Sequence, residues 1–239
     1  MDDRKKITLS RPGDGCGRVP LGLTVLVVED STYAAEALRL LCLRSGARIR
    51  RADSLNSARK HLKVYRPAAL IVDLGLPDGS GAELIEECAQ ASPRIGAILG
   101  LSGDSFGEET AIAAGADGFL PKPITSLARF QAEILGGLPP DLHPAATGLP
   151  EAEIIHPDPL AYRDDMAHAA ELLTVEGDGR ILDYVAQFLR GVARSADDAC
   201  LAEAADVLAR ARARGTPLAS PTARIAGLVQ QRLREAQPL

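Results

Sequence analysis

Apolar and polar positions follow two alternating patterns over the first 135 residues of the chain. Continuous apolar runs, such as residues 23–28 and 68–72, are rich in β-branched residues, as is typical of parallel strands buried on both faces. Between them, apolar residues recur at helical spacing, as in residues 32–44, which a Ser-Gly pair follows as a helix stop. The alternation predicts an α/β fold with a doubly wound, five-stranded parallel sheet.

The expected strands are residues 23–28, 47–51, 68–72, 95–101 and 118–120, and the expected helices are residues 32–44, 55–65, 81–90, 108–114 and 124–135. Later apolar positions predict three or four amphipathic helices, at residues 159–173, 179–193, 199–214 and 221–236, and so a small helical bundle. Four parts are expected: a flexible arm (1–20), an α/β domain (21–136), a Pro- and Gly-rich linker (137–157) and an all-α domain (158–237).

Charge and composition reduce the number of function classes that fit the chain. The net charge is −5, and residues 151–239 carry 10 Lys and Arg against 14 Asp and Glu, so a DNA-binding output domain is disfavoured. The basic run at Arg210, Arg212 and Arg214 is bracketed by acids and predicts a solvated helix face. The four cysteines show no metal or disulfide spacing, and we find neither an export signal nor an apolar span, which predicts a cytoplasmic protein without a membrane segment.

Five polar positions follow the ends of expected strands. They are Glu29, Asp30, Asp73, Ser102 and Lys122. Parallel strands bring their carboxyl ends to one edge of a sheet, where α/β active sites lie. Three carboxylates at one edge would repel one another unless a hard cation such as Mg²⁺ lay among them. An Asp carboxylate can accept a phosphoryl group, with Lys122 pairing with its oxygens and Ser102 hydrogen-bonding it, so Asp73 is the predicted phosphoacceptor.

The segments VLVVEDS, LIVDLGLPDGSG, LSG and ADGFLPKP resemble the four signature segments of response-regulator receiver domains, over about residues 22–136. The resemblance implies a flavodoxin-like receiver fold. It also implies that Glu29, Asp30 and Asp73 hold Mg²⁺ together with the backbone carbonyl of Gly75. Phe119 corresponds to the aromatic switch position and acts with Ser102. The Lys122–Pro123 peptide bond is expected to be cis.

A second resemblance concerns the all-α part. QFLRGVARSADDACLAEAADVL, at residues 187–208, is similar to the core motif of histidine-phosphotransfer (HPt) domains, but Gln187 occupies the histidine position. A carboxamide is not a nucleophile, so this domain should not carry a phosphoryl group there. Arg190 and Gly191 could still form a docking face for a partner. An unrelated helical bundle is the open alternative.

The leading hypothesis is therefore a response regulator that a histidine kinase or HPt protein phosphorylates on Asp73 and that signals by protein contacts through a pseudo-HPt domain, with homodimers as a further expectation. It is not expected to be an enzyme beyond its own phosphorylation and dephosphorylation. One alternative is a relay that passes phosphate to a histidine, of which His168 is the candidate, although Glu171 stands where a cation is wanted. A DNA-binding regulator is the third reading.

Overall fold

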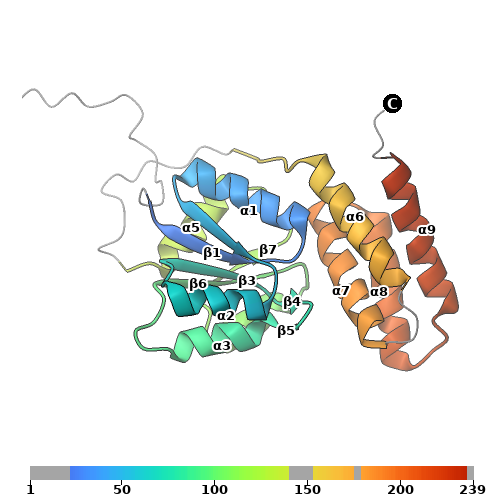
Figure 1. Cartoon of the computed structure of the whole chain (residues 1–239), viewed down its shortest axis with the longest axis horizontal. Helices are drawn as coiled ribbons and strands as arrows, with labels where there is room; N and C mark the ends of the chain where they lie inside the picture. The colour runs from blue at the N-terminus through green and yellow to red at the C-terminus, as the bar shows by residue number, and fades with distance from the viewer. Residues whose placement is uncertain (1–21, 140–152, 175–178, 236–239) are drawn as a thin grey trace, which may run out of the picture.

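A five-stranded parallel sheet forms the centre of the first domain in the computed structural model, which describes residues 22–139, 153–174 and 179–235 (Figure 1). The strand order is β2-β1-β3-β6-β7, and every pair is parallel. The strands are β1 (Thr24–Val28), β2 (Arg48–Ala52), β3 (Ala69–Asp73), β6 (Ala97–Ser102) and β7 (Gly118–Pro121). The expected doubly wound sheet is confirmed.

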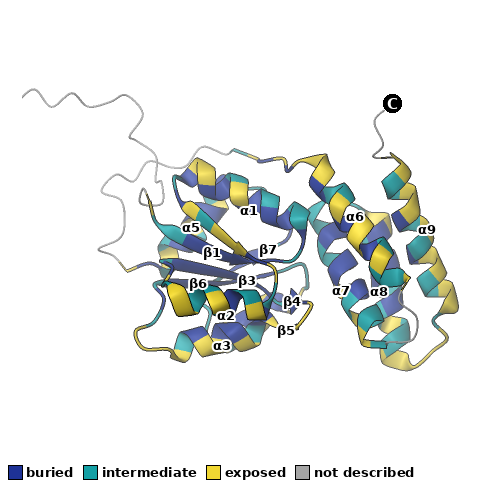
Figure 2. Ribbon diagram, viewed as in Figure 1, coloured by how far each residue is buried: buried dark blue, intermediate teal, exposed yellow. Residues whose placement is uncertain are grey.

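Helices cover both faces of this sheet, because alternate strand residues point to opposite sides. Val25 and Val27 pack under α1 (Thr32–Ser45) and α5 (Leu127–Gly137), whereas Leu26 and Val28 face the opposite layer. That layer consists of α2 (Leu55–Val64), α3 (Gly81–Gln90) and α4 (Gly107–Ala113). Figure 2 shows the central strands β1, β3 and β6 as buried, whereas the edge strand β2 is largely exposed. The central strands are apolar except at their ends, because neither face meets water.

A short hairpin that the sequence pattern did not predict follows β3. Its strands, β4 (Gly75–Leu76) and β5 (Gly79–Ser80), have two residues each and pair antiparallel. Two-residue strands leave too little periodicity to be recognised. The hairpin returns the chain to Gly81, which starts α3 so close to the backbone oxygen of Asp73 that any β-carbon there would overlap it. It thereby brings Gly75 back beside Asp73.

Four helices form the second domain, as the apolar spacing predicted: α6 (Pro159–Leu173), α7 (Gly179–Ser195), α8 (Ala199–Arg214) and α9 (Ala219–Glu235). Each packs beside the next, and α6 closes the ring against α9. Their apolar faces form one separate core that includes Met166, Leu189, Leu208 and Val229. This all-α domain is called the helical module below.

The helical module lies against the carboxyl-terminal edge of the sheet (Figure 1). Contacts run from α6 and α7 to α1, and from α7 to β4. Glu153, Ile154 and Ile155, from the expected linker, lie along the start of α5: Ile155 N–H donates to the carbonyl of Thr125, and its side chain is buried in the first domain's core. Residues 153–155 thus lie against the first domain shortly before α6 begins, while residues 140–152 of the expected linker lie outside the described residues.

Three remaining expectations concern single residues and segments. Cys42 and Cys88 are buried and free, and Cys200 is exposed and free, while Cys16 and the expected arm lie outside the described residues. The Lys122–Pro123 peptide bond is cis, as expected. Over the described part of the chain, no helix has the length and apolar character needed to cross a membrane.

Candidate functional site

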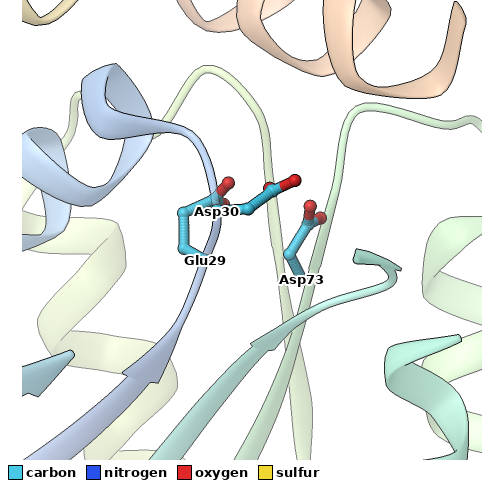
Figure 3. A group of neighbouring side chains, drawn as sticks. All are labelled: Glu29, Asp30 and Asp73. Carbon is cyan, nitrogen blue, oxygen red and sulfur yellow. The ribbon is translucent and has the colours of Figure 1, made fainter. Parts of the chain in front are cut away.

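Three carboxylates meet at the edge of the sheet that faces the helical module. Glu29 and Asp30 directly follow β1, and Asp73 ends β3, the neighbouring strand. Each offers an oxygen atom, and these atoms lie within 4.8 Å of one another. Figure 3 shows the three side chains converging from the two strand ends. Adjacent parallel strands have thus brought together residues that are more than 40 positions apart in the sequence.

Lys122, which follows β7, supplies the opposite charge. Its Nζ lies 2.8 Å from Oε2 of Glu29 and 3.3 Å from Oδ2 of Asp73. Glu29 and Lys122 are almost completely buried, and Asp73 is 7% exposed. Glu29 Oε2 is itself buried, and the Lys122 ammonium is the cation that it pairs with. A charge buried to this extent is retained only when it is paired.

The electrostatics of this cluster follow from its burial. Desolvation raises the pKa of Asp73 to about 7, against the opposing effect of Lys122. Desolvation, then the charges of Glu29 and Asp73, raise the pKa of Asp30 well above its usual range. For Lys122, burial acts to lower the pKa, but the neighbouring carboxylates outweigh it and raise the pKa. Three acids thus share one cation, and the edge has an excess of negative charge.

This excess makes the cluster a suitable donor set for Mg²⁺. Carboxylate oxygens are the ligands that Mg²⁺ prefers, and it is usually held by only one or two of them plus water and phosphate. A divalent cation would offset the negative charge that Lys122 leaves unbalanced and would lower the raised pKa of Asp30 and Asp73. The residues present therefore fit the expected ion.

Ser102 and Phe119 lie together beside this cluster. Ser102 ends β6, and its Oγ accepts a hydrogen bond from Asp104 N–H at 3.0 Å. Phe119 lies on β7 and its ring is buried. Gly107, the first residue of α4, packs between them, because a β-carbon placed on it would meet both side chains. Ser102 and the ring of Phe119 are therefore both packed against the start of α4.

A tyrosine of the helical module reaches the acidic cluster. Tyr184 on α7 donates its hydroxyl proton to Oδ2 of Asp30 at 2.6 Å. Burial, followed by the nearby charge of Asp30, raises the pKa of Tyr184, so the hydroxyl remains a donor. The module thus contacts one of the three carboxylates directly.

Gln187 lies one helical turn after Tyr184, and its side chain lies over Gly75 in the β4–β5 hairpin. Its carboxamide packs against Gly75 so closely that a β-carbon on Gly75 would overlap it. The backbone of Gly75 in turn lies beside the Asp73 carboxylate and acts to lower its pKa. Gln187 is nevertheless exposed to solvent and belongs to no core. Its side chain therefore borders the site and does not plug it.

Arg190 and Gly191 complete the part of α7 that faces the site. Arg190 pairs with Asp104 at 3.1 Å, and so connects the module to the loop after Ser102. Gly191 faces Lys122, whose Nζ lies 3.5 Å from the position that a β-carbon on Gly191 would take. The three module residues singled out from the sequence, Gln187, Arg190 and Gly191, thus face one cleft of about 330 Å³, which Asp73, Ser102 and Lys122 also line.

Asp165 on α6 was not singled out from the sequence. Its carboxylate accepts hydrogen bonds from Ser31 Oγ at 2.7 Å, Thr32 N–H at 2.7 Å and Tyr33 N–H at 3.1 Å. These groups form the N-terminus of α1, where unpaired N–H groups and the helix dipole favour an anion. Asp165 is only 2% exposed. It is the most completely buried polar contact between the two domains.

Sequence reasoning missed Asp165 and Tyr184 because neither belongs to a recognisable motif. Asp165 follows another Asp in an amphipathic helix, where acids normally face water, and Tyr184 reads as part of an apolar stripe. Their roles arise only from the contact between α6, α7 and the edge of the sheet. A buried-face position occupied by Asp is the one signal that could have indicated Asp165.

His168 lies away from the cleft of Asp73. It is exposed on α6, and its ring packs edge-on against Phe188, with the ring centroids 5.4 Å apart. It lines a different hollow between the domains, together with Arg180 and Tyr184. His168 therefore shares that hollow with Asp30, but the structure does not bring it into the cleft of Asp73, Ser102 and Lys122.

Comparisons with known proteins agree with this geometry over the first domain. Residues 25–134 match the family described as response regulator receiver domain. KdpE of Escherichia coli, a KDP operon transcriptional regulatory protein, is 32% identical over 142 residues, which is 59% of this chain and 58% of KdpE. CitB of Klebsiella pneumoniae, also a transcriptional regulatory protein, is 34% identical over 106 residues, or 43% of this chain and 45% of CitB.

The chain spans about half the length of these curated relatives. Among solved structures, a response regulator from Chloroflexus aurantiacus described as putative is 32% identical, covers 48% of this chain and 98% of its own, and has a TM-score of 0.45. The family match ends before α6, so it concerns the sheet and its helices. Residues 25–134 of this chain, with their acidic cluster at the sheet edge, are a two-component response regulator receiver domain.

Proposed function

We propose that the protein is a response regulator that accepts a phosphoryl group on Asp73 from a histidine kinase or HPt protein in the cytoplasm. One observation carries the proposal: Asp73 shares a buried site with Glu29, Asp30 and Lys122, and that site opens into a cleft. Oδ of Asp73 attacks the phosphorus atom, the donor's bond to phosphorus breaks, and its electron pair leaves with the donor.

Each neighbouring residue has a distinct part in this proposal. Mg²⁺, held by Glu29, Asp30, Asp73 and the carbonyl of Gly75, would neutralise phosphoryl oxygens. Lys122 also stabilises these oxygens as a point charge. Ser102 hydrogen-bonds the product, and Phe119 with α4 adapts to its movement. The packing of Gly107 between Ser102 and Phe119 supports this coupling.

The helical module is, in this proposal, a pseudo-HPt domain that works by binding. Gln187 projects from the middle of α7 with Arg190 and Gly191 beside it, which supports the HPt resemblance. Its docking against the receiver supports an interaction in cis, at the same edge that a partner's phosphohistidine must reach. We propose no nucleic-acid or membrane contact, and homodimers remain a prediction.

Phosphorylation can be tested on the full chain with Mg²⁺ and acetyl phosphate as donor. Intact-mass analysis should show one added phosphoryl group on the wild type and none on Asp73→Ala. Asp53→Ala is the matched control, because Asp53 is exposed beside the site and outside the cluster, and it should be labelled like the wild type. Equal labelling of the Asp73→Ala variant would refute the proposal.

A further inference from the structure

Gln187 lies where a partner's reactive group would have to approach Asp73. Its carboxamide packs against Gly75, and Gln187, Gly75 and Asp73 all line the same cleft. The same cleft is bordered by Lys122 and Arg190. A phosphoryl group on Asp73 would extend into this cleft, toward the face of α7 that carries Gln187.

The cleft also has room for the water that hydrolysis requires. Its volume of about 330 Å³ greatly exceeds the roughly 15 Å³ that one water needs. Gln187 is exposed, so bulk water reaches its side chain. A carboxamide can accept a hydrogen bond from water through its oxygen while its NH₂ group donates to a phosphoryl oxygen. It can thus orient a water molecule although it cannot attack phosphorus itself.

The backbone around Gln187 holds this group in place. Phe188 and Leu189, the next two residues of α7, are buried in the module's core. Tyr184 and Arg190, one turn before and one turn after, are bonded to Asp30 and Asp104 of the receiver. A polar group fixed on a rigid helix at both adjacent turns is suited to orienting a reactant.

We propose that the helical module hydrolyses the aspartyl phosphate of its own receiver, with Gln187 orienting the attacking water. The water oxygen forms a bond to phosphorus, and the bond from phosphorus to Oδ of Asp73 breaks. The electron pair of that bond returns to the carboxylate, and the proton of the water passes to the released phosphate or to solvent. The products are Asp73 and inorganic phosphate. This activity rests on the proposed phosphorylation of Asp73.

The test compares the lifetime of the phosphorylated full chain in the wild type, Gln187→Ala and Gln187→Leu. All are labelled with acetyl phosphate and Mg²⁺, the donor is removed, and loss of the phosphoryl mass is followed over time. Both variants should lengthen the half-life about tenfold or more, because neither can bind water, although Leu fills the space of Gln. Gln231→Ala, the same substitution at an exposed position of α9, should keep the wild-type half-life.

The same variants distinguish this role from one in which Gln187 keeps water away from the phosphoryl group. If Gln187 only excludes water, Gln187→Ala should shorten the half-life and Gln187→Leu should preserve it; either result, or equal half-lives in all variants, overturns the inference. Hydrogen exchange of the Thr32 and Tyr33 amides, which Asp165 protects, reports whether the module stays docked, and it should be unchanged in both variants. A chain that takes no label at Asp73 would instead contradict the proposed function.

Discussion

At the scale of single residues, the proposed phosphoryl transfer at Asp73 depends on the functional group that each neighbouring side chain carries. Lys122 presents a cation, and its pairing with Glu29 holds it at that position. In the proposed pseudo-HPt domain, Gln187 presents a carboxamide at the position where the HPt motif has a histidine. Imidazole is a nucleophile for phosphorus and carboxamide is not, so one side chain separates a relay from a terminal phosphoacceptor.

Gln187→His should therefore convert the module into a phosphoacceptor. After labelling with acetyl phosphate and Mg²⁺, we expect an acid-labile, base-stable phosphohistidine at position 187, because the docked helix holds the new imidazole at the mouth of the cleft. Peptide mapping at alkaline pH would locate it. Combining this change with Asp73→Ala should remove the label if it passes through Asp73. A label confined to Asp73 would show that α7 does not present this position in line with the phosphoryl group.

At the scale of elements, one residue joins three helices of the module. Asp198 caps α8 by accepting from Leu201 N–H, accepts the hydroxyl proton of Tyr162 on α6, and receives two bonds from Arg232 on α9. Burial acts to raise the pKa of Asp198, but these donors outweigh it and hold the pKa below its ordinary value. The orientation of α6 and α9, and so of Asp165, depends on this junction.

Asp198→Asn should lower the stability of the module by about 1 kcal/mol, since Asn still caps a helix but cannot pair with Arg232. Asp183→Asn is the matched control: Asp183 is paired with Arg212 in the same two-bond geometry but is 53% exposed, so a smaller loss is expected. Urea unfolding of the full chain, followed by hydrogen exchange in α8, measures both.

The contribution of Asp198 to the stability of the module should decrease at low pH. Because the folded-state pKa of Asp198 is depressed, the stability it adds is fully present above the unfolded pKa of about 3.9 and is lost as the pH falls through the lower folded-state pKa. The difference between wild type and Asp198→Asn should therefore shrink below about pH 4. A difference that grows on acidification would contradict the role given to Arg232.

At the scale of the whole molecule, the module covers the edge that a phosphodonor protein must reach. A small donor can enter the open cleft, whereas a protein donor needs the surface that α6 and α7 occupy. In the proposed function, docking of the module therefore competes with binding of the kinase or HPt partner. Its strength depends on Asp165, since removing a buried acceptor leaves the donors of α1 without a partner unless the domains separate.

Asp165→Ala should weaken docking by about 1–3 kcal/mol. We expect faster exchange of the Thr32 and Tyr33 amides, a larger radius of gyration in solution scattering, and faster phosphorylation by a purified phospho-HPt protein. The initial rate with acetyl phosphate should change little. Asp164→Ala is the matched control, because this neighbouring acid is exposed. Equal rates with the protein donor in both variants would argue against competition at this edge.

Much of the receiver could be predicted from sequence because its signals are local. The strands of a buried parallel sheet are continuous apolar runs, and α3, α6 and α8 have the expected bounds. The ends of other elements differ by a few residues, as with β6, because Ile95 and Gly96 are apolar or small without belonging to the strand. The β4–β5 hairpin was not predicted, because strands of two residues show no alternation of apolar and polar positions. Local periodicity shows that an element exists more reliably than where it ends.

The sequence by itself determined the α/β order and the strand-end acids with Lys122, because apolar periodicity and side-chain identity carry that information; through a resemblance it also predicts that Gln187 stands at a histidine position. Only the tertiary structure decided that α7 lies over Asp73, that Asp165 caps α1, and that Tyr184 reaches Asp30. These contacts join residues more than 100 positions apart, and complementary surfaces, not periodicity, select them. The sequence thus predicts a helical module that binds a partner. Its position over Asp73 shows that it contacts the first domain of its own chain.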